Sequence, residues 1–549
     1  MPGMRPDLSG VDPLVANLTR RVCIGDLTTR AAHQFGGRVA VVDGDVTLTF
    51  ADLEARADAV ARGLRERGHA RGDAIALQLQ NRWEFVVAFF ACAKIGVVAM
   101  PINLALSPAD VAYQLADSQV SAVISEEAFA PALEAALAGA PGAAVREVYL
   151  VGAPRETLGG VSVTGFGDLA AADTAPIETV VEDRDILHCL YTSGTTSRPK
   201  GVVTSHVAVQ IAVLTTAMTV GMRPDVVPVV QPIVLPLFHV TALDVVLLPT
   251  LTVGGAAVLL RGFDPARVAR TFVDHRVTHI ALLPMMWAAL LAAPAFVAAD
   301  TDALVTGFYA MAPMPAALLE QVRARFRNAA IILGSGQTET TPLSEMQWPG
   351  HQEGKDASWG PAVATTDIAI MGPDGELLPA GQEGEIVYRT PQLMEGYWNN
   401  AEANREAFAH GWFHGGDIGY LDDAGVVWFT DRAKDIIKSG GENVSSVEVE
   451  RVLLGHELVG EVAVVGTFDD RWGEAVTAIV VPAVPLGADR ERDAAEAIRA
   501  FARERLAGFK TPKSVVFAES LPKTATGKIQ KHRLRSTRSV AGVGRTEHR

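Results

Sequence analysis

Short apolar runs alternate with longer stretches that are apolar on one side only along the first two thirds of the chain. Residues 39–42 and 74–79 are strand-like runs, and between them residues 50–68 carry apolar side chains at helical spacing. Further strand-like runs follow at 186–191, 229–235, 280–283 and 331–333, with helical stretches at 110–116 and 131–137. Strands and helices in this order predict a large α/β body of mostly parallel sheets with flanking helices.

The pattern changes twice in the last third. Residues 372–389 are rich in Gly and Glu with alternating apolar positions, which predicts a small antiparallel, barrel-like element that closes the body. Beyond residue 434 the alternation restarts, with a helix at 446–453, strands at 462–466 and 476–481 and a helix at 494–506. We therefore expect an N-terminal domain over residues 1–433, a small α+β domain over 434–535 and a disordered tail over 536–549.

Composition narrows the class of protein. The 549 residues are 49% hydrophobic and 20% charged, which excludes a mainly disordered, collagenous or coiled-coil chain. The net charge of −15 opposes nonspecific binding to nucleic acid or to an acidic membrane surface. Cys23, Cys92 and Cys189 are too few for a disulfide framework or a zinc site, and the longest apolar stretches are interrupted by charges and prolines. We expect a cytoplasmic protein with no nucleic-acid partner and no transmembrane segment.

The strongest local signal is the run YTSGTTSRPKG at residues 191–201, directly after a predicted buried strand. Its small and hydroxyl-bearing residues let backbone N–H groups approach phosphate oxygens, and its lysine neutralises charge. The spacing is not that of a Walker A loop, and a flexible linker is the alternative. The candidate phosphate-binding residues are Thr192, Ser193, Gly194, Thr195, Thr196 and Lys200.

A second motif, GQTE at residues 336–339, also follows an apolar strand. A carboxylate at the C-terminal end of a strand, beside a phosphate loop, is suited to hold a Mg²⁺ that bridges nucleotide phosphates. Glu339 is the candidate metal ligand. An exposed glutamate at the start of a helix is the alternative interpretation.

Three more motifs with candidate chemistry lie in the last third. Asp417 can accept hydrogen bonds from both hydroxyls of a ribose, and Arg432 can bond phosphate or ribose oxygens. Gly440 and Gly441 either make a tight turn or let backbone come close to a ligand. Near the end, the lysine-rich run LPKTATGKIQK contains Lys528, which can place an ammonium against an anion. Turn residues and a solvated basic surface are the alternatives.

Together these motifs resemble the adenylate-forming superfamily, which contains the acyl-CoA synthetases, the luciferases and the adenylation domains of peptide synthetases. The resemblance runs in order from TLTFADL at residues 47–53 to Lys528. It implies a large N-terminal domain and a small, mobile C-terminal domain that turns about a hinge at Lys434. It also implies the reaction: a carboxylate attacks the α-phosphate of ATP with Mg²⁺ bound, pyrophosphate leaves, and a thiol takes the acyl group from acyl-AMP.

The resemblance assigns roles by matching motif. The loop from Thr192 to Lys200 would hold the β- and γ-phosphates, and Thr338 with Glu339 would serve the α-phosphate and the metal. Lys528 would bridge the substrate carboxylate and the α-phosphate, which offsets the repulsion between two anions. The other nucleotide-binding residues would be Gly336, Gln337, Asp417 and Arg432, with the last two at the ribose. A tunnel for the pantetheine of coenzyme A would be lined by Lys438, Gly440, Gly441 and Glu442.

The chain departs from the family's usual pattern beside these motifs. Ser335 stands where an aromatic residue usually stacks on adenine. Gly415 replaces a usual Thr, Asp431 replaces a usual Gly, and Phe468 replaces a common Pro. None of these positions carries the expected carboxylate or metal chemistry.

The resemblance also bears on the acid. His239 stands where peptide-synthetase relatives have an Asp that pairs with an α-amino group, so an α-amino acid is not expected. The expected pocket is apolar or small, which suits an acyl chain or an aromatic ring. Because Gly334 and Ser335 leave room for a deep chain, a medium- or long-chain fatty acid is the first expectation and an aryl or arylpropenoic acid the second. The candidate acid-binding residues are Phe238, His239, Gly307, Gly334 and Ser335.

The thiol is expected to be coenzyme A, because the run GGEN at residues 440–443 looks like the CoA-ligase version of this segment. Three rivals share part of the pattern: an enzyme that loads an acyl-carrier protein, a luciferase-like oxygenase and a noncatalytic nucleotide-binding scaffold. The expected partners are therefore a small carboxylic acid, ATP and coenzyme A. A homodimer is left open.

Overall fold

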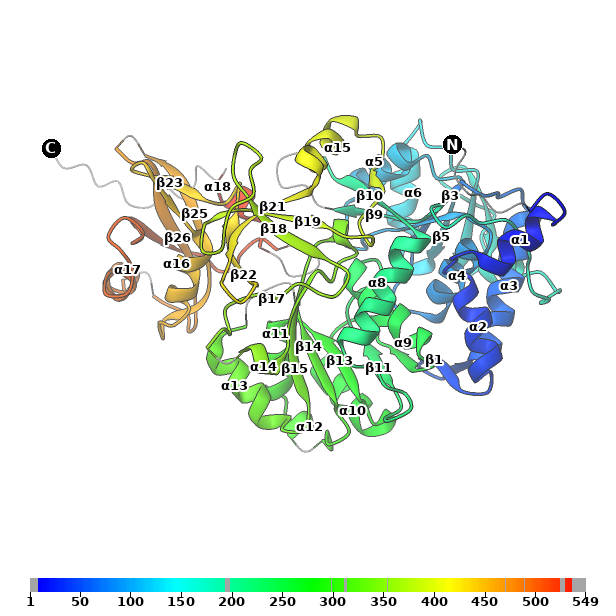
Figure 1. Cartoon of the computed structure of the whole chain (residues 1–549), viewed down its shortest axis with the longest axis horizontal. Helices are drawn as coiled ribbons and strands as arrows, with labels where there is room; N and C mark the ends of the chain where they lie inside the picture. The colour runs from blue at the N-terminus through cyan, green and yellow to red at the C-terminus, as the bar shows by residue number, and fades with distance from the viewer. Residues whose placement is uncertain are drawn as a thin grey trace.

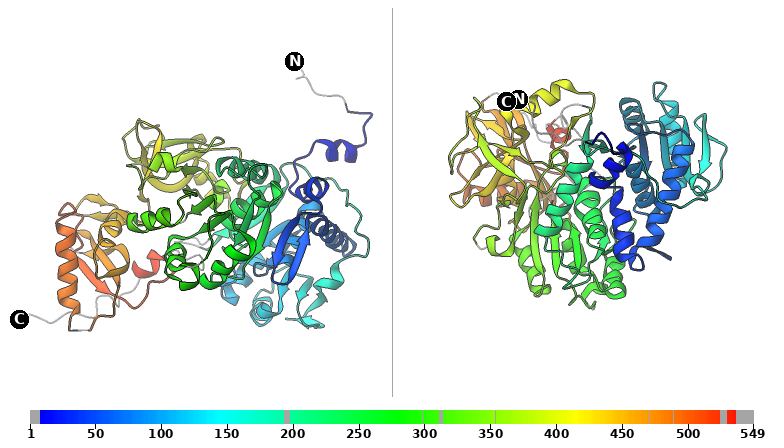
Figure 2. Two further views of the ribbon diagram at one scale, coloured as in Figure 1. Left: turned by 90° about the horizontal axis from the view of Figure 1, so that it is seen from below. Right: turned by 45° about the vertical axis from the view of Figure 1, so that its right-hand side comes forward.

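The structure is a computed structural model that describes residues 8–192, 198–297, 299–310, 314–352, 354–469, 471–487, 489–523 and 529–535. The tail 536–549, for which the sequence predicts disorder, lies outside the described residues. The described chain forms a large body and a small C-terminal unit at one end of it (Figure 1). In the left view of Figure 2 the small unit lies at the end farthest from the N-terminal helices.

The largest sheet of the body has nine strands in the order β20-β10-β9-β4-β3-β5-β6-β8-β7. Neighbouring strands are parallel from β9 to β8, whereas β10 is antiparallel to both β9 and β20. The strands are β3 (Ala74–Gln78), β4 (Val98–Pro101), β5 (Ala122–Glu126), β6 (Glu147–Val151), β7 (Thr157–Leu158), β8 (Val161–Gly165), β9 (Ile186–Thr192), β10 (Lys200–Ser205) and β20 (Gly396–Tyr397).

Helices cover both faces of this sheet because side chains alternate along its strands. Ile75 and Leu77 of β3 belong to one buried apolar cluster with residues of α3 (Phe50–Glu66) and α4 (Trp83–Lys94). Ala76, on the other face, belongs to a second cluster with residues of α5 (Pro108–Ser118) and α6 (Ala130–Ala138). The sheet is therefore the middle layer of the body.

Two four-stranded sheets extend the parallel part of the body, in the orders β11-β12-β1-β2 and β13-β14-β15-β16. In each, the first three strands are parallel and the last is antiparallel. The strands are β1 (Val39–Asp43), β2 (Val46–Thr49), β11 (Val230–Ile233), β12 (Ala256–Leu259), β13 (His279–Leu282), β14 (Thr306–Tyr309), β15 (Ala330–Ser335) and β16 (Glu345–Gln347).

The remaining helical elements of the body surround these sheets. The α-helices are α1 (Pro13–Arg20), α2 (Asp26–Phe35), α7 (Phe166–Leu169), α8 (His206–Thr219), α9 (Leu248–Thr252), α10 (Pro265–His275), α11 (Pro284–Ala292), α12 (Pro294–Val297), α13 (Ala316–Arg325), α14 (Pro349–Gln352) and α15 (Ala401–Ala407). The π-helical segment is η2 (Thr241–Leu247), and the 3₁₀ turns are η1 (Glu127–Phe129), η3 (Thr338–Thr340) and η4 (Ala409–Gly411).

An antiparallel sheet closes the body, as the sequence predicts. Its five strands run in the order β17-β22-β21-β19-β18, and all neighbouring pairs are antiparallel. They are β17 (Gly360–Pro361), β18 (Asp367–Met371), β19 (Gly384–Arg389), β21 (Phe413–Leu421) and β22 (Val426–Arg432).

The small unit forms one sheet with three helices. Strand order is β24-β23-β26-β25, with β27 beside β26. The unit buries apolar clusters of its own, and their buried members all lie between Ile437 and Leu521. Its elements are β23 (Ile437–Ser439), β24 (Glu442–Val444), β25 (Val459–Asp469), β26 (Gly473–Pro482), β27 (Ser514–Phe517), α16 (Ser446–Leu453), α17 (Glu491–Arg503) and α18 (Lys531–Arg535). The predicted α/β body with an α+β C-terminal unit is thus confirmed.

One lysine lies in the core of the body. Lys94 is 4% exposed, and its ammonium on α4 lies 2.8 Å from Glu54 Oε1 and 3.0 Å from Asp58 Oδ1, both on α3. It also donates to Thr29 Oγ1 at 3.0 Å. Burial raises the pKa of Asp58 to about 6 although Lys94 opposes the shift. The cation therefore compensates carboxylates that are held out of water.

We predict that Lys94→Met destabilises the N-terminal part of the chain by about 3–5 kcal/mol at neutral pH, because it leaves two buried carboxyls without their cation. Since the folded-state pKa of Asp58 is raised, the stability associated with its protonated form is lost as pH rises through that pKa. The destabilisation should therefore be greater at pH 8 than at pH 5. Thermal unfolding at both pH values measures it.

Lys355→Met is the matched control, because Lys355 makes a 2.7 Å ion pair with Asp422 at a partly exposed site. Its loss should cost no more than about 1 kcal/mol. Equal effects of the two substitutions would contradict the role given to Lys94.

Candidate active site

The phosphate-loop motif joins two antiparallel strands. β9 ends at Thr192 and β10 begins at Lys200, and these two residues are cross-strand partners. The loop between them therefore leaves the sheet at the C-terminal end of β9, the edge at which open α/β sheets bind ligands. The predicted roles of four loop residues lie outside the described residues, namely those of Ser193, Gly194, Thr195 and Thr196.

Tyr397 brings the phosphate-loop motif and the GQTE motif together. It lies on β20, which pairs with β10. The Lys200 ammonium is 4.6 Å from the centre of its ring, and its hydroxyl donates to Glu339 Oε1 at 2.9 Å. Burial, with the adjacent Glu339 charge, raises the pKa of Tyr397 well above its usual value, so the phenol stays protonated as a donor. Sequence reasoning missed Tyr397 because its role depends on pairing between strands far apart in the chain.

The turn after β15 fixes the GQTE motif. Gly336 has a φ of +146°, and a Cβ there would lie 1.4 Å from the Pro342 carbonyl oxygen, so only glycine fits. The backbone amide of Gln337 donates to Thr340 Oγ1 at 3.1 Å, and the backbone amide of Thr340 donates to the backbone carbonyl of Gln337 at 3.0 Å. Thr338 and Glu339 are therefore presented from a short 3₁₀ turn with an anchored backbone.

Asp417 and Arg432 face each other across β21 and β22, where they are direct cross-strand partners. Arg432 Nε lies 3.2 Å from Asp417 Oδ1, and the Gln337 side-chain amide donates to Asp417 Oδ2 at 2.6 Å. The structure therefore unites the two residues predicted at the ribose with the GQTE motif. Gly415, where the family usually has Thr, lies beneath the Gln337 amide: a Cβ there would be 2.1 Å from Gln337 Nε2.

A buried carboxyl group that sequence reasoning missed lies behind this pair. Glu345 on β16 is fully buried and is the cross-strand partner of Ser335. Burial, helped by the nearby Asp417 charge and opposed by the Tyr388 hydrogen bond, raises the pKa of Glu345 to about 8. Glu345 therefore holds a proton at neutral pH, which spares Asp417 a second negative charge. Its MQW context contains no motif that could have revealed it.

The predicted acid-binding residues lie beside two apolar clusters. Phe238 and His239 immediately precede the segment Val240–Leu247, whose π-helical part carries Ala242 and Leu243. The cluster that contains these two residues also contains Phe308 of β14. A Cβ at Gly334 would lie 2.3 Å from the Phe308 ring, whereas one at Gly307 would meet Trp287 and Ile331 in another cluster.

The predicted CoA segment is a β-hairpin of the small unit. β23 and β24 pair with Lys438 opposite Asn443, and the turn is Gly440–Gly441, with φ values of +64° and +88°. Two consecutive positive φ values are typical of the tight hairpin turns that favour glycine. A Cβ at Gly441 would meet nothing within 4 Å, whereas one at Gly440 would meet the Trp472 ring. Glu442 begins β24.

Side chains tie the small unit to the body around Lys434. Asp431, at the end of β22, accepts from the backbone amide and the hydroxyl of Ser446, both at 2.6 Å. Lys531 donates to the same hydroxyl at 2.6 Å, and Arg535 donates to the Lys434 carbonyl at 2.8 Å. Lys528, predicted to act in adenylation, lies outside the described residues.

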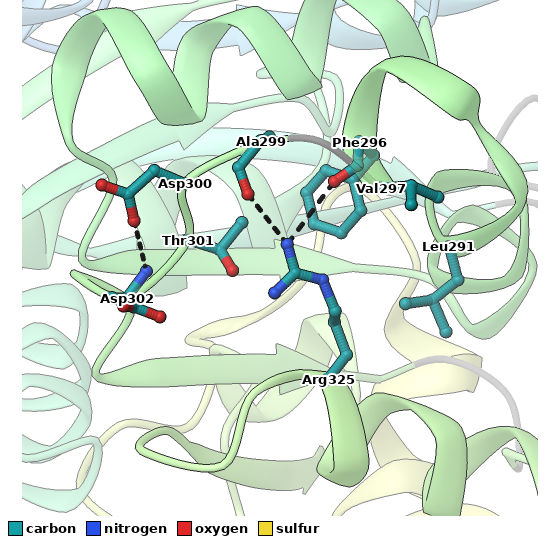
Figure 3. Close-up of a pocket in the computed structure, with 8 residues that line it drawn as sticks. All are labelled: Leu291, Phe296, Val297, Ala299, Asp300, Thr301, Asp302 and Arg325. Atoms are coloured by element: carbon teal, nitrogen blue, oxygen red, sulfur yellow. Dashed lines mark hydrogen bonds between the residues drawn. The ribbon is translucent and has the colours of Figure 1, made fainter.

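A surface cavity of about 500 Å³ lies elsewhere, beside α11, α12 and α13 (Figure 3). Arg325 points across it and donates to the backbone carbonyl of Ala299 at 2.9 Å. The described lining includes none of the predicted site residues; it consists of Leu291, Phe296, Val297, Ala299, Asp300, Thr301, Asp302 and Arg325. This cavity is not the candidate site.

The described part of the chain contains neither a cluster of metal-ligating side chains nor a helix that could cross a membrane. There, no three His, Cys, Asp or Glu side chains gather into a group that could hold a metal. No described helix is long and apolar enough to cross a membrane.

Comparison with known proteins gives matches over nearly the whole chain. Residues 28–398 match the AMP-binding enzyme family, and residues 448–528 match the AMP-binding enzyme C-terminal domain. A feruloyl-CoA synthase from Amycolatopsis sp is 36% identical over 93% of this chain and 98% of its own length. A long-chain fatty acid–CoA ligase from Mycobacterium tuberculosis is also 36% identical, over 90% of this chain and 94% of its own length.

Solved structures agree with these matches. The o-succinylbenzoate CoA synthetase of Bacillus subtilis, in complex with ATP and magnesium ion, superposes with a TM-score of 0.80 at 29% identity. The match covers 93% of this chain and 99% of that one. A complex of the same enzyme contains its acyl-adenylate intermediate. With both family models matched in order and relatives above 30% identity over nine tenths of its length, the chain belongs to the adenylate-forming superfamily of AMP-binding enzymes, in its acyl-CoA synthetase branch.

Proposed function

We propose that the chain is an AMP-forming acid–CoA ligase, which converts a carboxylic acid into its CoA thioester through an acyl-adenylate. The observation that carries the proposal is the convergence of Lys200 and Glu339 on Tyr397, beside the facing pair Asp417 and Arg432. These are the groups that a phosphate chain, its metal and a ribose require. Its cosubstrates are accordingly ATP and coenzyme A, and its metal is Mg²⁺.

The first half reaction joins the acid to AMP. A carboxylate oxygen bonds to the α-phosphorus of ATP, the bond from that phosphorus to the bridging oxygen breaks, and pyrophosphate leaves. No general base is required, because the acid is already ionised at neutral pH. Lys200 neutralises phosphate charge, Thr338 bonds the α-phosphate, and Lys528 offsets the repulsion between carboxylate and phosphate.

The residues around Glu339 fit a Mg²⁺ ion. Its Oε1 is oriented by the Tyr397 hydroxyl, and that bond leaves Oε2 to serve as an oxygen ligand of the kind this ion prefers. When bound, Mg²⁺ withdraws charge from the phosphate oxygens and so eases the departure of pyrophosphate. Tyr397 acts by holding the carboxylate in place.

The second half reaction transfers the acyl group. The sulfur of coenzyme A bonds to the acyl carbonyl carbon, the thiol proton passes to water, and AMP leaves. We assign this step to a second pose of the small domain, 434–535, which turns against the N-terminal domain, 1–433, about Lys434. In that pose the hairpin tip lines the passage of pantetheine through Lys438, Gly440, Gly441 and Glu442.

The acid is an aryl or arylpropenoic acid in this proposal, rather than the fatty acid expected first. The fatty-acid expectation rested on free depth at Gly334, and the Phe308 ring fills that space. The Phe308 ring instead offers a flat surface, and the π-helical segment an apolar one, against which an aromatic ring can pack. The similarity to a feruloyl-CoA synthase supports this choice, and the equal identity to a fatty acid–CoA ligase keeps a fatty acid as the second candidate.

A direct assay distinguishes coenzyme A from a carrier-protein thiol as the acyl acceptor. Purified enzyme, acid and ATP are given either free coenzyme A or a phosphopantetheinylated carrier protein, and thioester is measured. Thioester with the carrier alone would replace the CoA-ligase proposal with a loading enzyme.

We predict that Glu339→Gln lowers ATP–pyrophosphate exchange about 10²-fold and raises the Mg²⁺ concentration needed for half-maximal rate, because an anionic ligand is lost with its shape kept. Tyr397→Phe keeps the charge and loses only the orienting bond, so about a tenfold loss is expected. Thermal unfolding checks that both variants fold. An unchanged Mg²⁺ dependence in Glu339→Gln would remove this residue from the metal site.

We predict that the two half reactions separate by substitution. Lys528→Ala should lower acyl-AMP formation about 10²–10³-fold and still make acyl-CoA from supplied acyl-AMP. Gly441→Leu should adenylate normally and lose thioester formation, since its side chain occupies the passage. Gly425→Leu is the matched control, because Gly425 also has a positive φ and open space around it. Parallel loss of both half reactions in Lys528→Ala and Gly441→Leu would refute the separate assignments.

We predict that cinnamic acid is adenylated with a higher kcat/KM than octanoic or palmitic acid in pyrophosphate exchange. Phe308→Ala should raise the palmitic-to-cinnamic ratio at least about tenfold, the low end of what one apolar contact contributes to discrimination, because it opens the space beside Gly334. Tyr309→Phe is the control, since Tyr309 belongs to the cluster on the other face. A wild-type preference for palmitic acid would overturn the aryl assignment and leave the ligase proposal intact.

A further inference from the structure

The Asp417 carboxylate is closed off from solvent in this structure. Its side chain is 2% exposed, although the proposed function requires it to bond the hydroxyls of a ribose. Oδ1 faces Arg432, and Oδ2 accepts the 2.6 Å hydrogen bond from the Gln337 amide. A ribose hydroxyl can therefore reach this carboxylate only after one of its covering groups has moved.

Of these two covering groups, the Gln337 side chain can move while the backbone stays in place. Its backbone is anchored on both sides by the hydrogen bonds with Thr340. Its side chain reaches Asp417 through rotatable bonds, and rotamer changes of partly exposed side chains are fast. Arg432, by contrast, lies at the end of β22 as the cross-strand partner of Asp417. A change of the Gln337 rotamer therefore removes this hydrogen bond from Oδ2 without moving the backbone.

Gly415 provides the space in which the amide rests. A Cβ at this position would lie 2.1 Å from Gln337 Nε2 and 2.5 Å from Oε1. No positive φ demands glycine at position 415, unlike Gly416 with a φ of +77°. The absence of a side chain at Gly415 is thus explained by the resting place of the Gln337 amide and not by the backbone.

We propose that Gln337 is a displaceable cap on the ribose-binding carboxylate: its amide occupies Asp417 in the nucleotide-free chain and gives way to the ribose hydroxyls when a nucleotide binds. The proposal rests on the proposed function, which gives Asp417 to the ribose. Because Glu345 is protonated beside it, Asp417 is the charged acceptor of this cluster, and the cap supplies a donor to it while the site is empty.

The cap makes a prediction opposite in sign to that of a permanent positioning group. A nucleotide that displaces the amide loses the hydrogen bond between Gln337 and Asp417, so removal of the amide should strengthen nucleotide binding. A carboxylate oxygen has two lone pairs, and a permanent Gln337 donor would share Oδ2 with the ribose. In that case removal of the amide would weaken binding.

The test measures the Kd of AMP and of 2′,3′-dideoxy-AMP by calorimetry on the full chain. Gln337→Met keeps the length of the side chain without its donor, and should lower the Kd of AMP about tenfold, as expected for one hydrogen bond to a charged group. The Kd of dideoxy-AMP should not change, because that ligand has no hydroxyl with which to displace the cap. Thermal unfolding without ligand reports whether the variant is folded.

Gly415→Ala is the second variant, since its Cβ pushes the amide off Asp417 and leaves Gln337 itself in place. It should lower the Kd of AMP in the same direction. Gly425→Ala, in the turn between β21 and β22 of the same sheet, is the control and should leave both affinities unchanged. A Kd for AMP that is unchanged or higher in Gln337→Met overturns the cap, while a wild-type chain that binds neither nucleotide overturns the proposed function as well.

Discussion

The pairing of β10 with β9 on one side and with β20 on the other is the interaction on which the site depends. The first pairing returns the chain beside itself and forms the base of the phosphate loop. The second brings Tyr397 against Lys200, across more than a third of the sequence. Through Tyr397 the same edge of the sheet reaches Glu339, so a single antiparallel strand aligns a cation, a phenol and a carboxylate.

Much of the fold could be predicted because its signals are local. Thr49 is the N-cap of α3 and forms a capping box with Asp52, and the apolar residues of the helix repeat at helical spacing. The helix at α16 has the predicted bounds for the same reason. Strand order could not be predicted in this way, since β10 and β20 are joined only by hydrogen bonds between segments distant in the sequence.

The residues of the candidate site likewise fall into those that the sequence could predict and those that it could not. Asp417 and Arg432 lie in sequence motifs from which their roles could be predicted, and the structure brings them together as cross-strand partners. Tyr397 and Glu345 stand in ordinary contexts, so their roles follow only from the neighbours that the fold gives them. The depth of the proposed acid pocket likewise depends on packing. The sequence shows only a glycine at position 334, whereas in the structure the Phe308 ring occupies the space beside it.

Asp431 affects the rate of the proposed rotation between the body and the small unit. Its buried carboxylate accepts two hydrogen bonds from Ser446, on the far side of Lys434, and Ser446 in turn contacts Lys531. The resembled family usually has glycine at position 431, which offers no such tether. In the proposed reaction, rotation about Lys434 would break these bonds in every catalytic cycle, and hydrogen bonds to a buried charge are costly to leave unmade. The tether would therefore add to the activation barrier between the two proposed poses, so that the rate of domain rotation would depend on a residue that takes no part in the chemistry.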